Sequence, residues 1–191
     1  YQPELVYINT STLQTLPDVE FASGMGEALK HGFIKDDTYV TFMEDNVEAI
    51  GALDHDALSI LIGRSCEIKA AIVSEDEREH GLRAILNFGH TIGHAVEKLK
   101  NFTQLHGECV ALGMAASSYI STLTGDLTKD EYVRILDLIK AYQLPILVEG
   151  LEAQDIYNEM FYDKKQLSRG LISDGTIGQQ KLIRRYGVMI A

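Results

Sequence analysis

The chain has 191 residues, of which 46% are hydrophobic and 24% charged, and its formal net charge is -11. This length suffices for one ordinary domain with its own buried core, and the composition is typical of a globular protein rather than a disordered or fibrous one. The acidic balance argues against a nucleic-acid surface, which needs a basic face, although a local cluster of Lys and Arg can still bind a small anion.

The two cysteines lack disulfide or metal-ligand spacing, and no apolar run approaches the length of a membrane span. No charged-then-apolar leader opens the chain, so a cytoplasmic protein with no membrane partner is expected. The opening YQPELVYINT reads as internal sequence, which indicates a piece of a longer polypeptide.

Helical patterns dominate the chain after one short predicted strand at ELVYIN, residues 4–9. Asp18 predicts the start of a helix, and the glycines at 24 and 26 predict a bend or a tight packing point within it. The further predicted helices cover residues 36–50, 54–74, 82–99, 109–125, 128–144 and about 155–165. The tail at 170–188 is predicted to hold loops and a strand. We therefore expect a single mainly α domain over 1–191, bundle-like, with minor short strands at its ends.

The segment 82–99 carries a polar stripe among apolar residues. Successive members of the stripe are separated by 4, 3, 4 and 3 positions, which would place them on one face of a helix; they are Arg83, Asn87, His90, His94 and Glu97. Because unpaired buried polar groups cost on the order of a few kcal/mol each, the stripe must be paired or must face a solvated pocket. The spacing alone leaves open whether that pocket holds metal, substrate or another helix.

Two glycines and two histidines in this segment share a spacing of four residues. Gly89 and Gly93 would let another backbone approach closely. His90 and His94 could bind one ion, but the intervening TIG lacks the glutamate of an HExxH motif, which excludes a metalloprotease. The segments GEALKHG and LHGE could supply a carboxylate and a further imidazole, and two imidazoles with one carboxylate suit a catalytic zinc.

Four stretches of the chain resemble the C-terminal half of the 3-dehydroquinate synthase family, within the sugar-phosphate cyclases. They are SGMGEALKHGFIKD, EIKAAIVSEDEREHGLRAILNFGHTIGHAVE, LHGECVALGM and DKK, and their order agrees over most of residues 1–165. The segment DEREHGLR is more similar to the dehydroquinate synthases than to the valiolone or inosose cyclases. The resemblance implies a helical domain of this type, whereas the family's N-terminal NAD-binding domain is absent, since no G-x-G-x-x-G occurs.

The resemblance also implies roles for individual residues. Glu27, His90 and His106 match the family's divalent-metal ligands, usually for Zn2+ with Co2+ able to substitute. Lys30 and His94 match catalytic residues. The residues that match contacts to the substrate's phosphate, carboxylate and hydroxyls are Lys30, Lys69, Arg83, Asn87, His94 and Lys164, the last favoured over Lys165. NAD+ is expected to be bound mainly by the missing N-terminal domain.

The reaction implied by the resemblance converts 3-deoxy-D-arabino-heptulosonate 7-phosphate, a small anionic sugar-acid phosphate, to 3-dehydroquinate and phosphate. This is a phosphorus–oxygen lyase reaction of the shikimate pathway, in aromatic amino-acid biosynthesis. Since the family's site lies between two halves, the isolated chain is expected to be inactive without its N-terminal partner domain. The alternatives are a related sugar-phosphate cyclase, a glycerol-type metal-dependent dehydrogenase, or a non-catalytic metal-binding helical module, and a homodimer is left open.

The remaining polar residues near these motifs receive simpler expectations. Glu97 is expected to have a structural role or to orient a ligand. His31, His55 and His80 are expected at the surface.

Overall fold

The computed structural model describes residues 4–75 and 82–167, with the side chains at 82–83 and 161–167 left outside the description. The described part is helical. Its elements are η1 (Thr10–Thr15), α1 (Asp18–Lys35), α2 (Asp37–Asp45), α3 (Val47–Gly51), α4 (His55–Glu75), η2 (Leu82–Asn87), α5 (His90–Leu99), α6 (His106–Thr124), α7 (Lys129–Ala141) and α8 (Ala153–Leu167). This confirms the predicted mainly α class. Within the described ranges, no helix is both long and apolar enough to cross a bilayer.

The short strand predicted at residues 4–9 is not formed. These residues are irregular, and the apolar side chains from Leu5 to Ile8 are 50–83% exposed. A strand needs a neighbour for its backbone hydrogen bonds, and the described residues include no other strand. The strand predicted at 170–188 lies outside the described residues.

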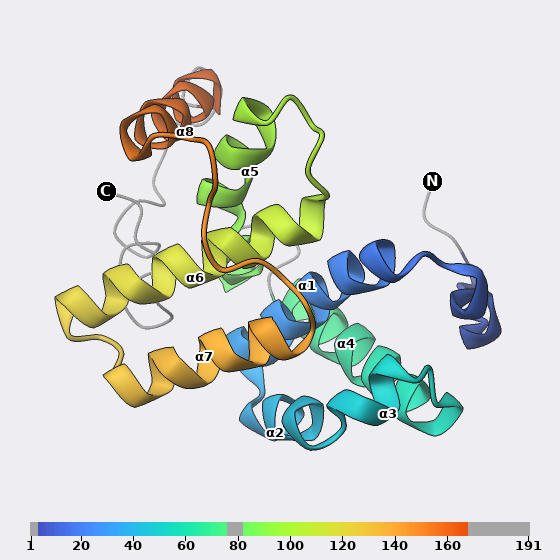
Figure 1. The fold of residues 1–191 in the computed structure, drawn as a ribbon. Helices are drawn as coiled ribbons and strands as arrows, with labels where there is room; N and C mark the ends of the chain where they lie inside the picture. Colours follow the sequence, from blue (N-terminus) through green and yellow to red (C-terminus); the bar gives the residue numbers. More distant parts are fainter. Residues whose placement is uncertain (1–3, 76–81, 168–191) are drawn as a thin grey trace.

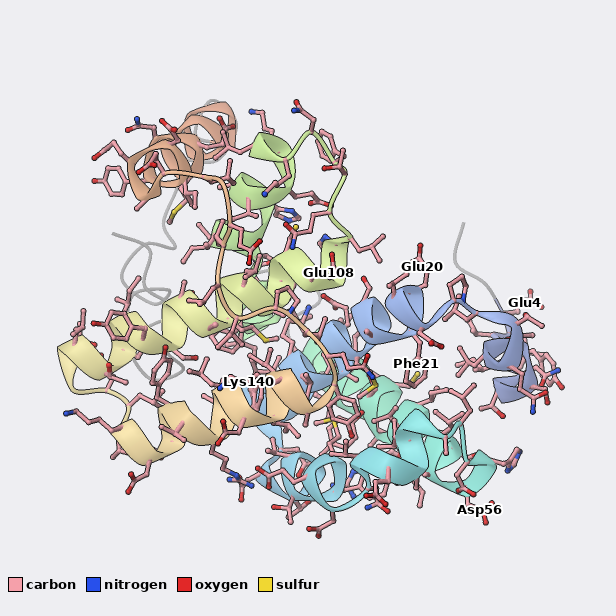
Figure 2. The ribbon with its side chains drawn as sticks, in the orientation of Figure 1. Glu4, Glu20, Phe21, Asp56, Glu108 and Lys140 are labelled. Carbon is pink, nitrogen blue, oxygen red and sulfur yellow. The ribbon has the colours of Figure 1, made fainter. Side chains whose placement is uncertain are left out.

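Helix α6 lies in the middle of the molecule and contacts α1, α5 and α7. Helices α5 and α8 lie on one side of it, and α1 and α7 lie on the other, with α2, α3 and α4 beyond α1 (Figure 1). The outward faces carry charged side chains such as Glu20, Asp56 and Lys140 (Figure 2).

The main hydrophobic core lies between α1, α2, α4, α6 and α7, and its fully buried members include Leu29, Met43, Ile72, Met114 and Ile139. A second, smaller cluster joins α5, α6 and α8. It contains Ile92, Val96 and Leu112, with Ile156 and Met160 of α8 packed against them. Burial of these apolar side chains, about 1.5–3 kcal/mol each, fixes α5 and α1 on α6.

Close backbone contacts join α1 to α6. A Cβ added at Gly26 would lie 2.6 Å from the carbonyl oxygen of Gly107, and one added at Gly107 would lie 1.8 Å from that of Ser23. The tight packing point predicted around Gly26 is therefore confirmed, and α1 runs through it as one continuous helix.

The helix predicted over 82–99 is divided into two elements. The 3-10 helix η2 ends at Asn87, and α5 begins at His90 after Gly89, whose φ of +78° lies in the left-handed region. Only glycine adopts this conformation easily, and a Cβ there would also lie 2.6 Å from the carbonyl oxygen of Val110 in α6. The predicted stripe is thus not one helical face, because Arg83 and Asn87 precede the turn.

The other helix boundaries differ less from the predicted ones. The helix predicted over 36–50 is interrupted at Asn46, which separates α2 from α3, and α6 begins at His106 rather than 109. Helix α7 begins after Thr128, whose side chain accepts a hydrogen bond from the backbone N–H of Glu131, as a helix start at this position predicts.

Candidate metal centre

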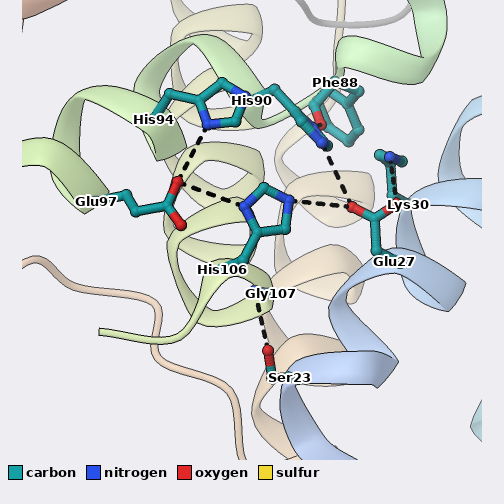
Figure 3. Close-up of polar contacts among 9 residues, drawn as sticks. All are labelled: Ser23, Glu27, Lys30, Phe88, His90, His94, Glu97, His106 and Gly107. Carbon is teal, nitrogen blue, oxygen red and sulfur yellow. Dashed lines mark hydrogen bonds and ion pairs between the residues drawn. The ribbon is translucent and has the colours of Figure 1, made fainter. Parts of the chain in front are cut away.

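Three polar side chains from three helices converge at one point. Glu27 comes from α1, while His90 and His106 are the first residues of α5 and α6. Their ligand atoms all lie within 4.8 Å of one another (Figure 3). The convergence expected for these three residues is therefore present in the structure.

The carboxylate of Glu27 uses its two oxygens differently. Oε2 accepts a hydrogen bond from Nζ of Lys30 at 2.7 Å. Oε1 is buried without a hydrogen-bond partner, and it lies 3.5 Å from Nε2 of His90 and 3.9 Å from Nε2 of His106. A buried acceptor without a donor is costly, and it is satisfied when a cation lies between it and the imidazoles. One carboxylate oxygen and two imidazole nitrogens form a donor set that fits Zn2+ or Co2+.

The protonation of His90 is suited to metal binding. Its Nδ1 lies 3.2 Å from the carbonyl oxygen of Phe88, and because a carbonyl only accepts, Nδ1 carries the hydrogen and Nε2 carries the lone pair. Burial, together with the nearby charge of Lys30, lowers the pKa of His90 to about 4. The ring is therefore neutral at neutral pH, with its lone pair directed at Glu27.

The start of α6 is fixed on α1 by a hydrogen bond from a backbone N–H to a serine side chain. The N–H of Gly107 donates to Oγ of Ser23 at 3.0 Å. Since His106 is the neighbour of Gly107, this contact holds its ring beside Glu27, one turn further along α1. Glu108, the other candidate donor of LHGE, instead accepts a hydrogen bond from the N–H of Leu105 and caps the helix.

Lys30 is buried, with only 3% of its surface exposed, and it lies against Glu27. Burial lowers the pKa of Lys30, and the charge of Glu27 opposes that shift only in part. For Glu27, burial alone would raise the pKa, but the charge and hydrogen bond of Lys30, together with smaller contributions from His90 and His31, leave the pKa below its ordinary value. Lys30 and Glu27 therefore form an ion pair beside the two imidazoles.

The structure describes the side chains of only some of the residues expected to contact substrate. His94 lies one turn beyond His90, with ring centroids 5.3 Å apart, and its side chain is 47% exposed. Lys69 and Asn87 are exposed, and the charge of Lys69 adds to burial in lowering the pKa of Lys30. The side chains of Arg83 and Lys164 lie outside the described residues.

The expectation that His31 is at the surface is wrong. Its side chain is buried, its Nδ1 lies 2.7 Å from Oγ of Ser65 in α4, and its Nε2 has no hydrogen-bond partner. Burial lowers the pKa of His31 to about 4. The helical spacing contained a signal for this, because His31 is three residues from both Ala28 and Ile34 on the buried face of α1.

Comparison with known proteins gives a consistent result. The family described as 3-dehydroquinate synthase C-terminal matches residues 24–166. The 3-dehydroquinate synthase of Acetivibrio thermocellus is 45% identical over 165 residues, covering 86% of this chain and 46% of the relative. That of Geobacter sp. (strain M21) is 46% identical over 173 residues, covering 90% and 48%. The chain thus spans about half the length of the curated relatives it matches.

Solved structures agree in fold. The 2-epi-5-epi-valiolone synthase of Streptomyces hygroscopicus, with NAD+ and Zn2+ bound, superposes with a TM-score of 0.77 at 26% identity, covering 83% of this chain and 45% of that one. A 2-deoxy-scyllo-inosose synthase complexed with carbaglucose-6-phosphate, NAD+ and Co2+ gives 0.76 at 24% identity, covering 87% and 46%, a likeness of fold alone. On the match over residues 24–166 and these identities, the chain belongs to the 3-dehydroquinate synthase family and corresponds to its C-terminal domain.

Proposed function

We propose that this chain is the metal- and substrate-binding half of a 3-dehydroquinate synthase, a phosphorus–oxygen lyase that converts 3-deoxy-D-arabino-heptulosonate 7-phosphate to 3-dehydroquinate and phosphate. The observation that carries the proposal is the convergence of Glu27, His90 and His106 from three separate helices. Each of the three stands at a position that matches a metal ligand of the family.

The metal would be held by Oε1 of Glu27 and the imidazoles of His90 and His106. A divalent ion there supplies Lewis acidity that favours loss of a proton from a neighbouring substrate hydroxyl. The buried, unpaired Oε1 and the neutral His90 both support this assignment. Lys30 stays paired to Oε2, so it adds positive charge without occupying the oxygen that faces the imidazoles.

The other proposed roles concern the substrate. His94 presents an exposed ring one turn from His90, where it would contact a substrate hydroxyl. Lys30 and Lys69 would neutralise the substrate's anionic groups, and Asn87 would offer an amide to them. Arg83 and Lys164 are assigned to the phosphate and carboxylate from the family match alone. The chain's own contribution is therefore to position an anion and neutralise its charge beside the donor set.

The proposal includes a division of the protein into two parts. This chain would form one helical domain. Because it covers only 46% of the Acetivibrio thermocellus relative, a domain that binds NAD+ would occupy the remaining length, on the N-terminal side. The identity to 3-dehydroquinate synthases, 45%, exceeds the 26% to the valiolone synthase, which favours this reaction over that of a related cyclase.

Zinc binding tests the centre directly. The purified chain is titrated with Zn2+ in competition with a chromophoric chelator, alongside His90→Ala and Arg83→Ala. We expect one zinc per wild-type chain, loss of that zinc in His90→Ala, and retention in Arg83→Ala with weakened binding of the sugar-acid phosphate. Zinc binding unchanged by His90→Ala would overturn the site.

Activity requires the other half. The N-terminal half of the Acetivibrio thermocellus relative is joined to this chain, and phosphate release from the sugar-acid phosphate is measured with NAD+. We expect release that depends on Glu27 and is absent when either half is supplied alone. A chimera that binds zinc and NAD+ yet releases no phosphate would favour a non-catalytic metal-binding module.

A further inference from the structure

One carboxylate oxygen lies between two imidazoles at the far side of the metal centre. Oε2 of Glu97, in the last turn of α5, lies 3.2 Å from Nδ1 of His94 and 3.5 Å from Nδ1 of His106 (Figure 3). The Glu97 side chain is only 17% exposed. A single oxygen thus faces both a proposed metal ligand and a proposed substrate contact.

The carboxylate favours particular hydrogen positions on both rings. An ionised carboxylate only accepts hydrogen bonds, so Nδ1 of His94, which is hydrogen-bonded to Oε2, must carry a hydrogen. Nδ1 of His106 faces the same oxygen at 3.5 Å, closer than the 3.9 Å between its Nε2 and Glu27, which favours a hydrogen on Nδ1 there too. A neutral imidazole with its hydrogen on Nδ1 has its lone pair on Nε2. In His106 this Nε2 is the atom that lies 3.9 Å from Oε1 of Glu27, on the side of the donor set.

A second cation among His94, Glu97 and His106 is the competing interpretation, since their ligand atoms also lie within 4.8 Å of one another. A neutral imidazole has one lone pair, so His106 can serve only one of the two donor sets at a time. Using Nδ1 for a cation would move the hydrogen to Nε2 and remove His106 from the set with Glu27. That set already has a buried unpaired oxygen and a neutral His90 with its lone pair in place.

We propose that Glu97 is a positioning residue that keeps the hydrogen on Nδ1 of both His106 and His94. Both rings then present an unprotonated Nε2, one to the metal donor set and the other to substrate, and a single oxygen links their orientations. Carboxylates that accept from the second nitrogen of a metal-binding histidine typically change metal affinity by 10- to 100-fold. The expected effect on metal affinity rests on the proposed function, whereas the hydrogen positions are a property of the metal-free chain.

Long-range 1H–15N correlation spectra of the metal-free chain at neutral pH read the tautomers directly, with His94→Gln and His106→Gln used to assign the signals. We expect hydrogen on Nδ1 in both rings of the wild type. In Glu97→Leu, which removes the acceptor, both rings should shift toward hydrogen on Nε2, and zinc affinity should fall 10- to 100-fold. Glu97→Gln should lie between, because its amide oxygen still accepts.

Glu159→Leu is the matched control. The side chain of Glu159 is 18% exposed and pairs with Lys98, so its removal takes away a similarly buried carboxylate without touching either ring. We expect wild-type tautomers and wild-type zinc affinity in this variant. A general loss of packing would instead affect both glutamate variants alike, which would overturn the proposal.

The outcomes separate this inference from the proposed function. A wild-type chain with hydrogen on both Nδ1 atoms that binds no zinc would support the role of Glu97 and refute the metal centre. A zinc-binding chain whose tautomers and affinity are unchanged in Glu97→Leu would refute the role of Glu97 alone. Two zinc ions per wild-type chain, falling to one in Glu97→Leu, would also overturn it in favour of the second cation.

Discussion

Gly107→Ala tests whether the separation of two helices sets the metal centre. The added Cβ would lie 1.8 Å from the carbonyl oxygen of Ser23, whereas real Cβ contacts stay above 3.0 Å. The start of α6 must therefore move away from α1 by roughly 1.2 Å or more, because a backbone oxygen cannot rotate aside as a side chain can. His106 precedes Gly107 and moves with it.

The expected magnitude follows from how little a metal site tolerates. Ligand distances in zinc sites vary by only about 0.2 Å, so a displacement of roughly 1 Å in one of three donors should lower zinc affinity by about 100-fold. Overpacking should also lower the free energy of unfolding by about 1–3 kcal/mol. Zinc competition titration and urea unfolding followed by circular dichroism measure the two effects.

Gly24→Ala is the matched control for this substitution. It lies in α1 near the same contact, but a Cβ there meets nothing within 4 Å. We expect unchanged zinc affinity and up to about 1 kcal/mol more stability, since alanine favours a helix over glycine. Gly26→Ala, with a milder 2.6 Å contact to Gly107, should weaken zinc binding less than Gly107→Ala does. A folded Gly107→Ala chain that binds zinc as tightly as the wild type would refute the reasoning.

Three further predictions concern stability. Arg134→Met removes two partly exposed ion pairs, Nε to Oε1 of Glu44 at 2.7 Å and a second nitrogen to Oδ1 of Asp37 at 2.6 Å. The free energy of unfolding in urea should therefore fall by about 1–2 kcal/mol, less at high salt, with zinc affinity unchanged. Tyr142→Phe removes the buried hydrogen bond from the tyrosine hydroxyl to the carbonyl oxygen of Met43, which should cost about 1–2 kcal/mol in the same assay. Burial lowers the pKa of His31 from 6.5 to about 4, so its neutral form favours the folded state and the stability it contributes should be complete above pH 6.5 and decline as the pH falls toward 4. Urea midpoints across this range should decline less steeply in His31→Leu than in the wild type.

Local signals predicted most of the helices correctly. Apolar patterns located α4, α6 and α7, and Asp18 and Thr128 marked the starts of α1 and α7, where the structure has them within one residue. The glycine spacing at Gly89 and Gly93 predicted a close backbone approach, and both glycines lie against α6. These features are local, because each depends on residues within one or two turns.

The errors arise where distant residues decide the outcome. The apolar period continues through residues 82–99, so it could not reveal that the chain turns at Gly89 over the backbone of α6. Residues 4–9 alternate like a strand, but a strand requires a partner that the described part of the chain does not provide. The convergence of Glu27, His90 and His106 depends on three helices meeting, so the residue pattern could only suggest it, and the resemblance to a family named the three residues.

Each proposed metal ligand is next to a glycine at which two backbones meet. Glu27 follows Gly26, His90 follows Gly89, and His106 precedes Gly107; a Cβ at any of these glycines would lie 2.6 Å or less from a carbonyl oxygen of another element. Contacts between backbones are stiffer than contacts between side chains, which can change rotamer. Burial of apolar side chains holds α1 and α5 on α6, and the backbone contacts at these glycines then limit how close the helices come and so set the spacing of the three donors. Conservative changes in the apolar core, such as Ile92→Val, should therefore lower stability while zinc affinity stays near wild type. An added methyl group at any of the three glycines should instead weaken zinc binding, even in a variant that remains folded.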